Sequence, residues 1–110
     1  MTATDLYEIV RDVPAQAAPD GLTLWTDVDK RCPDAWIVDS EIGVHQVSTH
    51  HAAMMFVGSM TAWLMNRNVF GSKSQIEETY WTIDMNNLNK RSGNYRTLVA
   101  ALAAACKEVK

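Results

Sequence analysis

Three histidines and two cysteines are the residues of this sequence that could bind zinc. His50 and His51 are adjacent, while His45, Cys32 and Cys106 lie elsewhere in the chain. Two neighbouring residues on a helix point about 100° apart, so this pair cannot easily share one metal, unlike histidines four residues apart. We therefore expect His50 and His51 to begin a helix without a metal. Metal binding by His45, His50 or His51 is the alternative.

A second group of residues could bind an anion or a nucleic acid. Lys90, Arg91 and Arg96 lie in the segment 86–96, which also holds Tyr95. Positive side chains attract phosphates, and an aromatic ring can stack on a base. The predicted alternative function is therefore a small nucleic-acid or anion-binding module that uses this basic loop. A solvated loop in front of the last helix is the simpler interpretation.

Short motifs that mark common catalytic sites are missing from the sequence. It holds no Gly-x-Ser-x-Gly nucleophile elbow, no His-Glu-x-x-His zinc motif and no Gly-x-Gly-x-x-Gly loop. Glu77 and Glu78 are adjacent acids near a predicted strand, and we expect them to be solvated and to discourage pairing between sheet edges. We predict that the protein is not an enzyme and carries no cofactor.

The composition suits one folded domain over residues 1–110. Of the 110 residues, 47% are hydrophobic and 21% are charged, which is far from the composition of disordered chains. The first 55 residues hold nine acids and three bases, whereas the remaining 55 hold four acids and seven bases. The formal net charge of −3 argues against nonspecific DNA binding.

Neither a membrane span nor a secretory signal is predicted. The longest apolar-rich stretch, 52–65, is shorter than the roughly 20 residues that cross a bilayer. The N-terminus lacks the basic and apolar regions of a signal peptide. We therefore expect a cytoplasmic protein whose two cysteines are reduced.

Sequence patterns predict an α+β fold with the order helix, three strands, helix, strand, helix. The first helix covers roughly 5–12, with Asp5 as its N-cap and Glu8 completing a capping box. Three short strands are predicted at 22–25, 35–38 and 42–47. After a turn at 71–74, alternation predicts a strand over 79–85, and helical spacing of apolar residues predicts a last helix over 95–109.

The central helix is the hydrophobic centre of the chain and is expected to run from Ser48 or Thr49, as N-cap, to about Asn66. Five apolar residues share one face of it: Ala53, Phe56, Val57, Met60 and Leu64. Other apolar residues lie off that face, so the helix is apolar on most sides and should be buried on more than one. The second side is predicted to face a partner, through Met54, Met55 and Trp63.

The segment Val47 to Val57 resembles the Tyr-Ser-Thr-Asp signature and Ala-rich helix of the phage ABA sandwich domain family. The later segments Tyr80 to Ile83 and Thr97 to Cys106 are similar to that family's aromatic-bearing strand and final Ala-rich helix. The resemblance covers about 44–108. It implies a small antiparallel sheet sandwiched by helices in a protein encoded by a phage or prophage, and it implies no chemistry.

These observations together predict a small non-enzymatic phage or prophage protein that acts by protein–protein interaction. The expected partner is another protein, from host or phage, or a second copy in a homodimer, with no membrane involved. The expected role is inhibition of a host process such as defence, in the host bacterial cytoplasm. That last step is an analogy with other small phage proteins.

Overall fold

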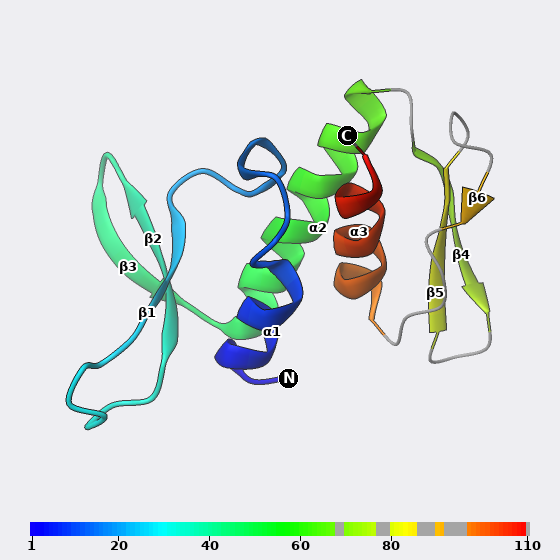
Figure 1. The fold of residues 1–110 in the computed structure, drawn as a ribbon. Helices are drawn as coiled ribbons and strands as arrows, with labels where there is room; N and C mark the ends of the chain where they lie inside the picture. The colour runs from blue at the N-terminus through cyan, green and yellow to red at the C-terminus, as the bar shows by residue number, and fades with distance from the viewer. Residues whose placement is uncertain (68–69, 77–79, 86–89, 92–96, 110) are drawn as a thin grey trace.

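The computed structural model of the chain describes residues 1–67, 70–76, 80–85, 90–91 and 97–109. It confirms an α+β fold with antiparallel strands, in roughly the predicted order of elements. Helices lie in the middle of the molecule, with one three-stranded sheet on either side (Figure 1). The layers are therefore the reverse of the single sheet sandwiched by helices that the resemblance implies. The helical segments are α1 (Ala3–Val10), η1 (Ala15–Ala17), α2 (Thr49–Asn66) and α3 (Leu98–Glu108).

The first helix begins three residues earlier than predicted. Thr2 is its N-cap: its hydroxyl accepts from the Asp5 N–H at 3.1 Å, and the Asp5 carboxylate accepts from the Thr2 N–H at 2.9 Å. The prediction of Asp5 as N-cap was therefore wrong, because Asp5 serves as the third helical residue of this capping box. The earlier start brings Ala3 into the core, where it is 9% exposed.

The central helix α2 has the predicted limits. The Ser48 hydroxyl accepts a hydrogen bond from the His51 N–H at 3.0 Å, so Ser48 is the N-cap. The core face of α2 consists of Ala52, Phe56, Met60, Trp63 and Leu64. Three residues of the predicted face are thus buried, while Ala53 and Val57 are half-buried at its margin.

The last helix, α3, covers one side of α2. Thr97 is its N-cap, because its hydroxyl accepts from the Ala100 N–H at 3.2 Å. Its buried residues are Val99, Ala101, Leu102, Ala103, Ala105 and Cys106. The predicted start near residue 95 lies outside the described residues.

The first sheet has the order β1 (Leu22–Trp25), β2 (Ala35–Ser40), β3 (Gly43–Val47). Gly21 must be glycine at the entrance of β1, because its φ is +75° and a Cβ there would collide with the carbonyl of Asp39. Trp36 of β2 joins the sheet to the helices. Its indole N–H donates to the Ala3 carbonyl at 3.2 Å, and its ring meets that of Phe56 edge to face at 5.6 Å.

The second sheet has the order β4 (Phe70–Ile76), β5 (Tyr80–Met85), β6 (Lys90–Arg91). Residues 71–74, which were predicted to form a turn, instead lie within β4, where Ser72, Lys73 and Ser74 pair with β5. The prediction was wrong because glycine and serine favour turns locally, whereas the backbone pairs with a neighbouring strand, which propensity alone does not anticipate. Among the described residues, no helix is long and apolar enough to cross a membrane.

Candidate binding surfaces

One side of α2 faces away from the core. Along it lie Met54, Gly58, Ala62 and Met65, which we call the α2 outer face. Met54 and Met65 are 55% and 58% exposed, and the two small residues between them are exposed as well. The whole helix contains no Asp, Glu, Lys or Arg. An exposed helix side in a protein normally carries such residues, so this surface is unusual.

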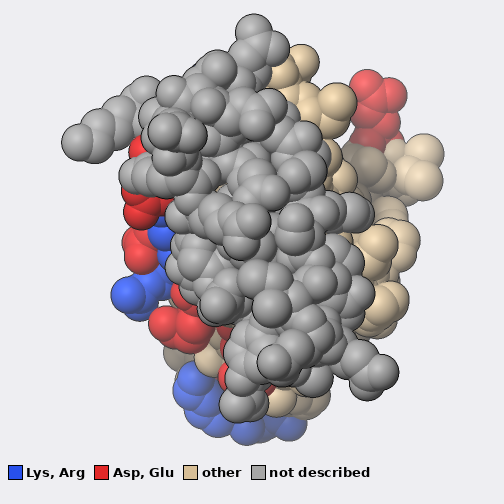
Figure 2. Space-filling model, turned by 90° about the vertical axis from the view of Figure 1, so that its right-hand side faces the viewer, with Lys and Arg blue, Asp and Glu red and all other residues tan. Residues whose placement is uncertain are grey.

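The charged side chains are gathered elsewhere on the molecule. Viewed from the side of the second sheet, Lys, Arg, Asp and Glu lie close together along one flank, whereas the opposite flank is largely uncharged (Figure 2). At the end of α1, for example, Arg11 lies 3.3 Å from Glu8 and 3.4 Å from Asp12, and all three side chains are exposed. Exposed pairs of this kind contribute little stability but keep a surface hydrated.

Nothing in the described part of the chain explains why position 58 is a glycine. A Cβ added there would meet nothing within 4 Å, and the position does not have a positive φ. Glycine in the middle of a helix costs about 0.5–1 kcal/mol relative to alanine. A small residue at such a position lets another backbone approach closely, and nothing in the described part of the chain does so.

The three predicted interface residues have different environments. Met54 is exposed on the α2 outer face, and Met55 is half-buried beside it. Trp63 is only 8% exposed and belongs to the core, with the Arg67 guanidinium 4.1 Å from the centre of its ring. Trp63 therefore offers little surface to a partner, because α2 turns its ring inward. Trp63 lies three residues after the buried Met60, although the predicted core face did not include it.

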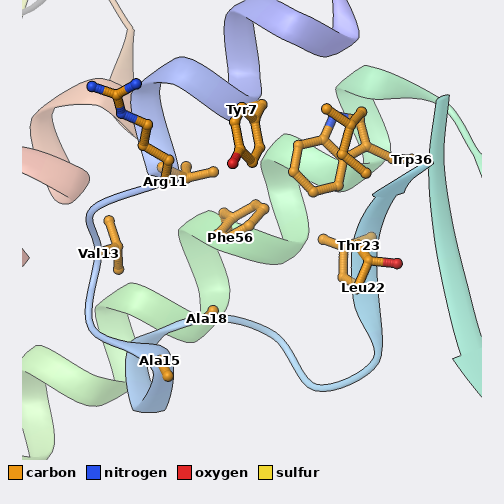
Figure 3. Close-up of a pocket in the computed structure, with 11 residues that line it drawn as sticks. Tyr7, Arg11, Val13, Ala15, Ala18, Leu22, Thr23, Trp36 and Phe56 are labelled. Atoms are coloured by element: carbon orange, nitrogen blue, oxygen red, sulfur yellow. The ribbon is translucent and has the colours of Figure 1, made fainter. Parts of the chain in front are cut away.

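A cavity of about 440 Å³ lies between α1, η1, β1 and α2 (Figure 3). Its walls are mostly apolar: Val10, Val13, Ala15, Ala18, Leu22, Leu24, Trp36 and Phe56. The Tyr7 hydroxyl points toward the middle of these residues, whereas the Arg11 guanidinium points away (Figure 3). Pockets that bind ligands have this size and this mainly apolar lining with a few polar groups.

Sequence reasoning missed this cavity. Most of its lining comes from the segment 7–24, but Trp36 and Phe56 come from elements further along the chain, so no local motif marks the whole cavity. The sequence feature that could have indicated the cavity is the pair Pro14 and Pro19, because proline ends α1 and makes the chain turn back across α2.

The candidate metal ligands do not form a cluster. His45, His50 and His51 are all exposed, as is Cys32, while Cys106 is buried in α3. Within the described ranges, no group of three His, Cys, Asp or Glu side chains is placed to hold a metal ion. Burial raises the pKa of the Cys106 thiol to about 12, which keeps it protonated and unreactive near neutral pH.

Asp27 organises the long loop between β1 and β2. Its carboxylate accepts hydrogen bonds from the backbone N–H groups of Asp29, Arg31 and Cys32 at 3.0, 3.1 and 3.0 Å. Lys30, inside this loop, has a φ of 59°. The Asp27 carboxylate is thus occupied by its own loop.

The basic residues of the predicted nucleic-acid module are only partly placed. Lys90 and Arg91 form β6 rather than a loop, in register with Met85 and Asp84 of β5, and Arg96 lies outside the described residues. Pairing with the end of β5 makes this segment a short strand. Nucleic-acid binding remains a prediction that a gel shift at low salt tests, with loss of binding expected when all three are changed to alanine.

No family model, curated protein or solved structure matched the chain in the comparisons made with each. The fold and the surfaces therefore carry the functional argument. They define an α+β protein with an uncharged, exposed helix side and an apolar cavity next to a sheet edge.

Proposed function

We propose that the protein acts by binding another protein, and that the α2 outer face is its binding surface. The observation that carries the proposal is Gly58: it lies exposed in the middle of an 18-residue helix without charged side chains, at a position where none of the described residues requires a glycine. Methionine side chains on either side of it provide adaptable apolar contacts, as is common in protein interfaces.

The occupant that this face suits best is a second copy of the chain. Met54 lies four residues before Gly58, and Met65 lies three residues after Ala62. The row therefore reads nearly the same in both directions. Two antiparallel copies of α2 would place small residue against small residue at the centre and methionine against methionine at both ends. A two-fold interface requires such a self-complementary surface.

Association of two copies would cover exposed apolar side chains, because Met54 and Met65 are 55% and 58% exposed. Covering the α2 outer face would remove apolar surface from water at about 25 cal/mol per Å².

The resemblance to phage ABA sandwich proteins suggests a second form of this proposal, in which the partner is a host protein. In a phage or prophage protein, the same face would serve to inhibit a host process by binding a host protein in place of the second copy. This form of the proposal predicts one host protein at equal stoichiometry in affinity purification from a bacterial cytoplasm, and its loss when Met54 is changed to lysine.

Light scattering at micromolar concentrations tests whether a second copy of the chain binds the α2 outer face. The wild-type protein should have twice the mass of the 12.3 kDa chain. Met54→Lys should return the mass of one chain, because a buried unpaired charge opposes association. Gly58→Leu should do the same, since the longer side chain would separate the two helices at a position where a Cβ meets none of the described atoms within 4 Å.

The matched control is Gln16→Lys, which adds the same charge at an exposed position on η1. Its mass should equal that of the wild type. A wild-type mass of one chain would contradict the homodimer. Unchanged association of both α2 variants would show that the α2 outer face is not the interface.

A further inference from the structure

We infer that the free edge of β1 and the cavity beside it form a binding site for an extended peptide with apolar side chains at alternate positions. The peptide would add a fourth strand to the first sheet and place two side chains in the cavity. This site shares no residue with the α2 outer face and does not depend on the function proposed for that face.

The hydrogen-bond pattern shows which groups of β1 are available. The Asp39 N–H donates to the Gly21 carbonyl at 2.9 Å, so Gly21 and Asp39 form a hydrogen-bonded pair of the antiparallel ladder. Such pairs alternate with unbonded ones along the strands. In the register Leu22 to Val38 and Leu24 to Trp36, the backbone groups of Leu22 and Leu24 therefore point away from β2.

Those groups have no partner among the described parts of the chain. The sheet order is β1-β2-β3, which leaves β1 at an edge, and no backbone hydrogen bond to Leu22 or Leu24 is found there. The edge also lacks the usual protection, because β1 contains no charged residue and no proline. Two N–H and two C=O groups thus remain to pair with one added strand.

The cavity lies next to these groups. Leu22 and Leu24 line it, together with Tyr7 and Phe56 from the helices (Figure 3). Residues that pair directly across two strands point to the same face of a sheet. Peptide residues opposite Leu22 and Leu24 would therefore direct their side chains into the cavity. Main-chain bonds would supply affinity and the cavity would supply specificity, as in other cases of strand addition.

Charge around the cavity favours a basic peptide. Asp20 is exposed and lies in the sequence between the lining residues Ala18 and Leu22, and Glu8 and Asp12 pair with Arg11, which is itself a lining residue. Acids thus outnumber bases among these residues. Lysine at both ends of the peptide would complement them, and the attraction should weaken with salt.

The test uses a synthetic peptide, acetyl-Lys-Thr-Phe-Thr-Phe-Thr-Lys-amide, and the full-length protein in isothermal titration calorimetry. In antiparallel pairing the phenylalanine N–H groups face β1 and the central threonine N–H faces water. Methylating the two phenylalanine nitrogens should therefore abolish binding. Methylating the central threonine nitrogen is the matched control and should leave the affinity within about twofold.

Protein variants test the cavity. Ala18→Leu places a larger apolar side chain in it and should weaken binding about tenfold or more, while leaving the melting temperature unchanged or higher. Gln16→Leu, two residues away and outside the cavity, should bind like the wild type. Replacing both phenylalanines of the peptide by alanine, or both lysines by glutamate, should lower its affinity for the protein.

Three results would overturn the inference. One is the absence of any binding of the phenylalanine peptide at millimolar concentration. Another is equal affinity of the two methylated peptides, which would show that the edge of β1 is not used. The third is full affinity of Ala18→Leu, which would place the peptide outside the cavity. The methylated peptides need no protein variant, so they decide the question even where a variant folds poorly.

Discussion

The two long sides of α2 are built from similar residues and have opposite environments. On the core side, Phe56, Met60 and Leu64 are at most 4% exposed. On the α2 outer face, Met54 and Met65 are more than half exposed. Hydrophobic composition therefore does not separate a core side from a surface that another molecule covers. The small residues Gly58 and Ala62 mark the difference, because the core side is filled by large side chains.

The sharpest way to test this comparison is to remove one large side chain from each side. Phe56→Ala should lower the free energy of unfolding by about 3–5 kcal/mol, because it leaves a cavity beside Trp36. Met54→Ala should change it by less than about 0.5 kcal/mol in the dissociated chain. Urea denaturation at low protein concentration measures both. Equal losses would mean that Met54 also belongs to the core of one chain.

Alkaline pH should lower the stability of the folded chain, because the buried Cys106 of α3 favours the folded state only while its thiol is neutral. Because burial raises the pKa of Cys106 to about 12 from 9.0, the thiol stays neutral in the folded chain where it would ionise in the unfolded one. Its contribution to stability is complete below about pH 9 and is lost as the pH rises toward 12. Thermal unfolding between pH 8 and 11 measures this loss.

Cysteine variants isolate this effect. Cys106→Ala should flatten the alkaline part of the profile, whereas Cys32→Ala should leave it as in the wild type, since Cys32 is exposed. An identical profile for all three proteins would assign the alkaline loss to other groups.

Both sides of α2 depend on the same N-cap. Ser48→Ala removes the acceptor for the His51 N–H and should cost about 1 kcal/mol. Ser48→Asn, which supplies another acceptor, should recover most of that loss. An unchanged free energy of unfolding for Ser48→Ala, measured by calorimetry, would mean that water replaces the hydroxyl at the start of α2. The N-cap would then not help to position the outer face.

A small expected gain in stability at Gly58 is informative about the outer face. Gly58→Ala should stabilise the dissociated chain by about 0.5–1 kcal/mol, because alanine favours a helix and its Cβ meets no atom. The same variant should weaken association of the two copies. A variant that gains stability and keeps full association would show that nothing approaches the backbone at Gly58.

The elements with strong local signals could be predicted from the sequence. Ser48 and the apolar spacing set the limits of α2, and alternation located β5. The start of α1 was misplaced because Thr2 with Asp5 and Asp5 with Glu8 have the same capping spacing, and only burial of Ala3 distinguishes them. The strand β4 depends on its pairing with β5, which a window of neighbouring residues does not contain.

The surfaces were less predictable than the fold. Met54 and Trp63 both lie off the predicted core face, yet Met54 is exposed and Trp63 is buried, because the burial of each depends on which neighbours pack against α2. The sequence alone does not mark Gly58 as a binding position, because the empty space around its Cα is known only from the structure. The edge of β1 follows from strand order and hydrogen-bond register, both of which involve residues distant in the chain.

The loop held by Asp27 gives the protein a built-in attachment point for a spectroscopic label. Cys32 is exposed on that loop, next to a backbone fixed by three hydrogen bonds to one carboxylate, while Cys106 is buried with its thiol protonated. A nitroxide reagent should therefore react at Cys32 alone in the native protein, without any engineered cysteine. The separation of two such labels would measure directly how two copies are arranged.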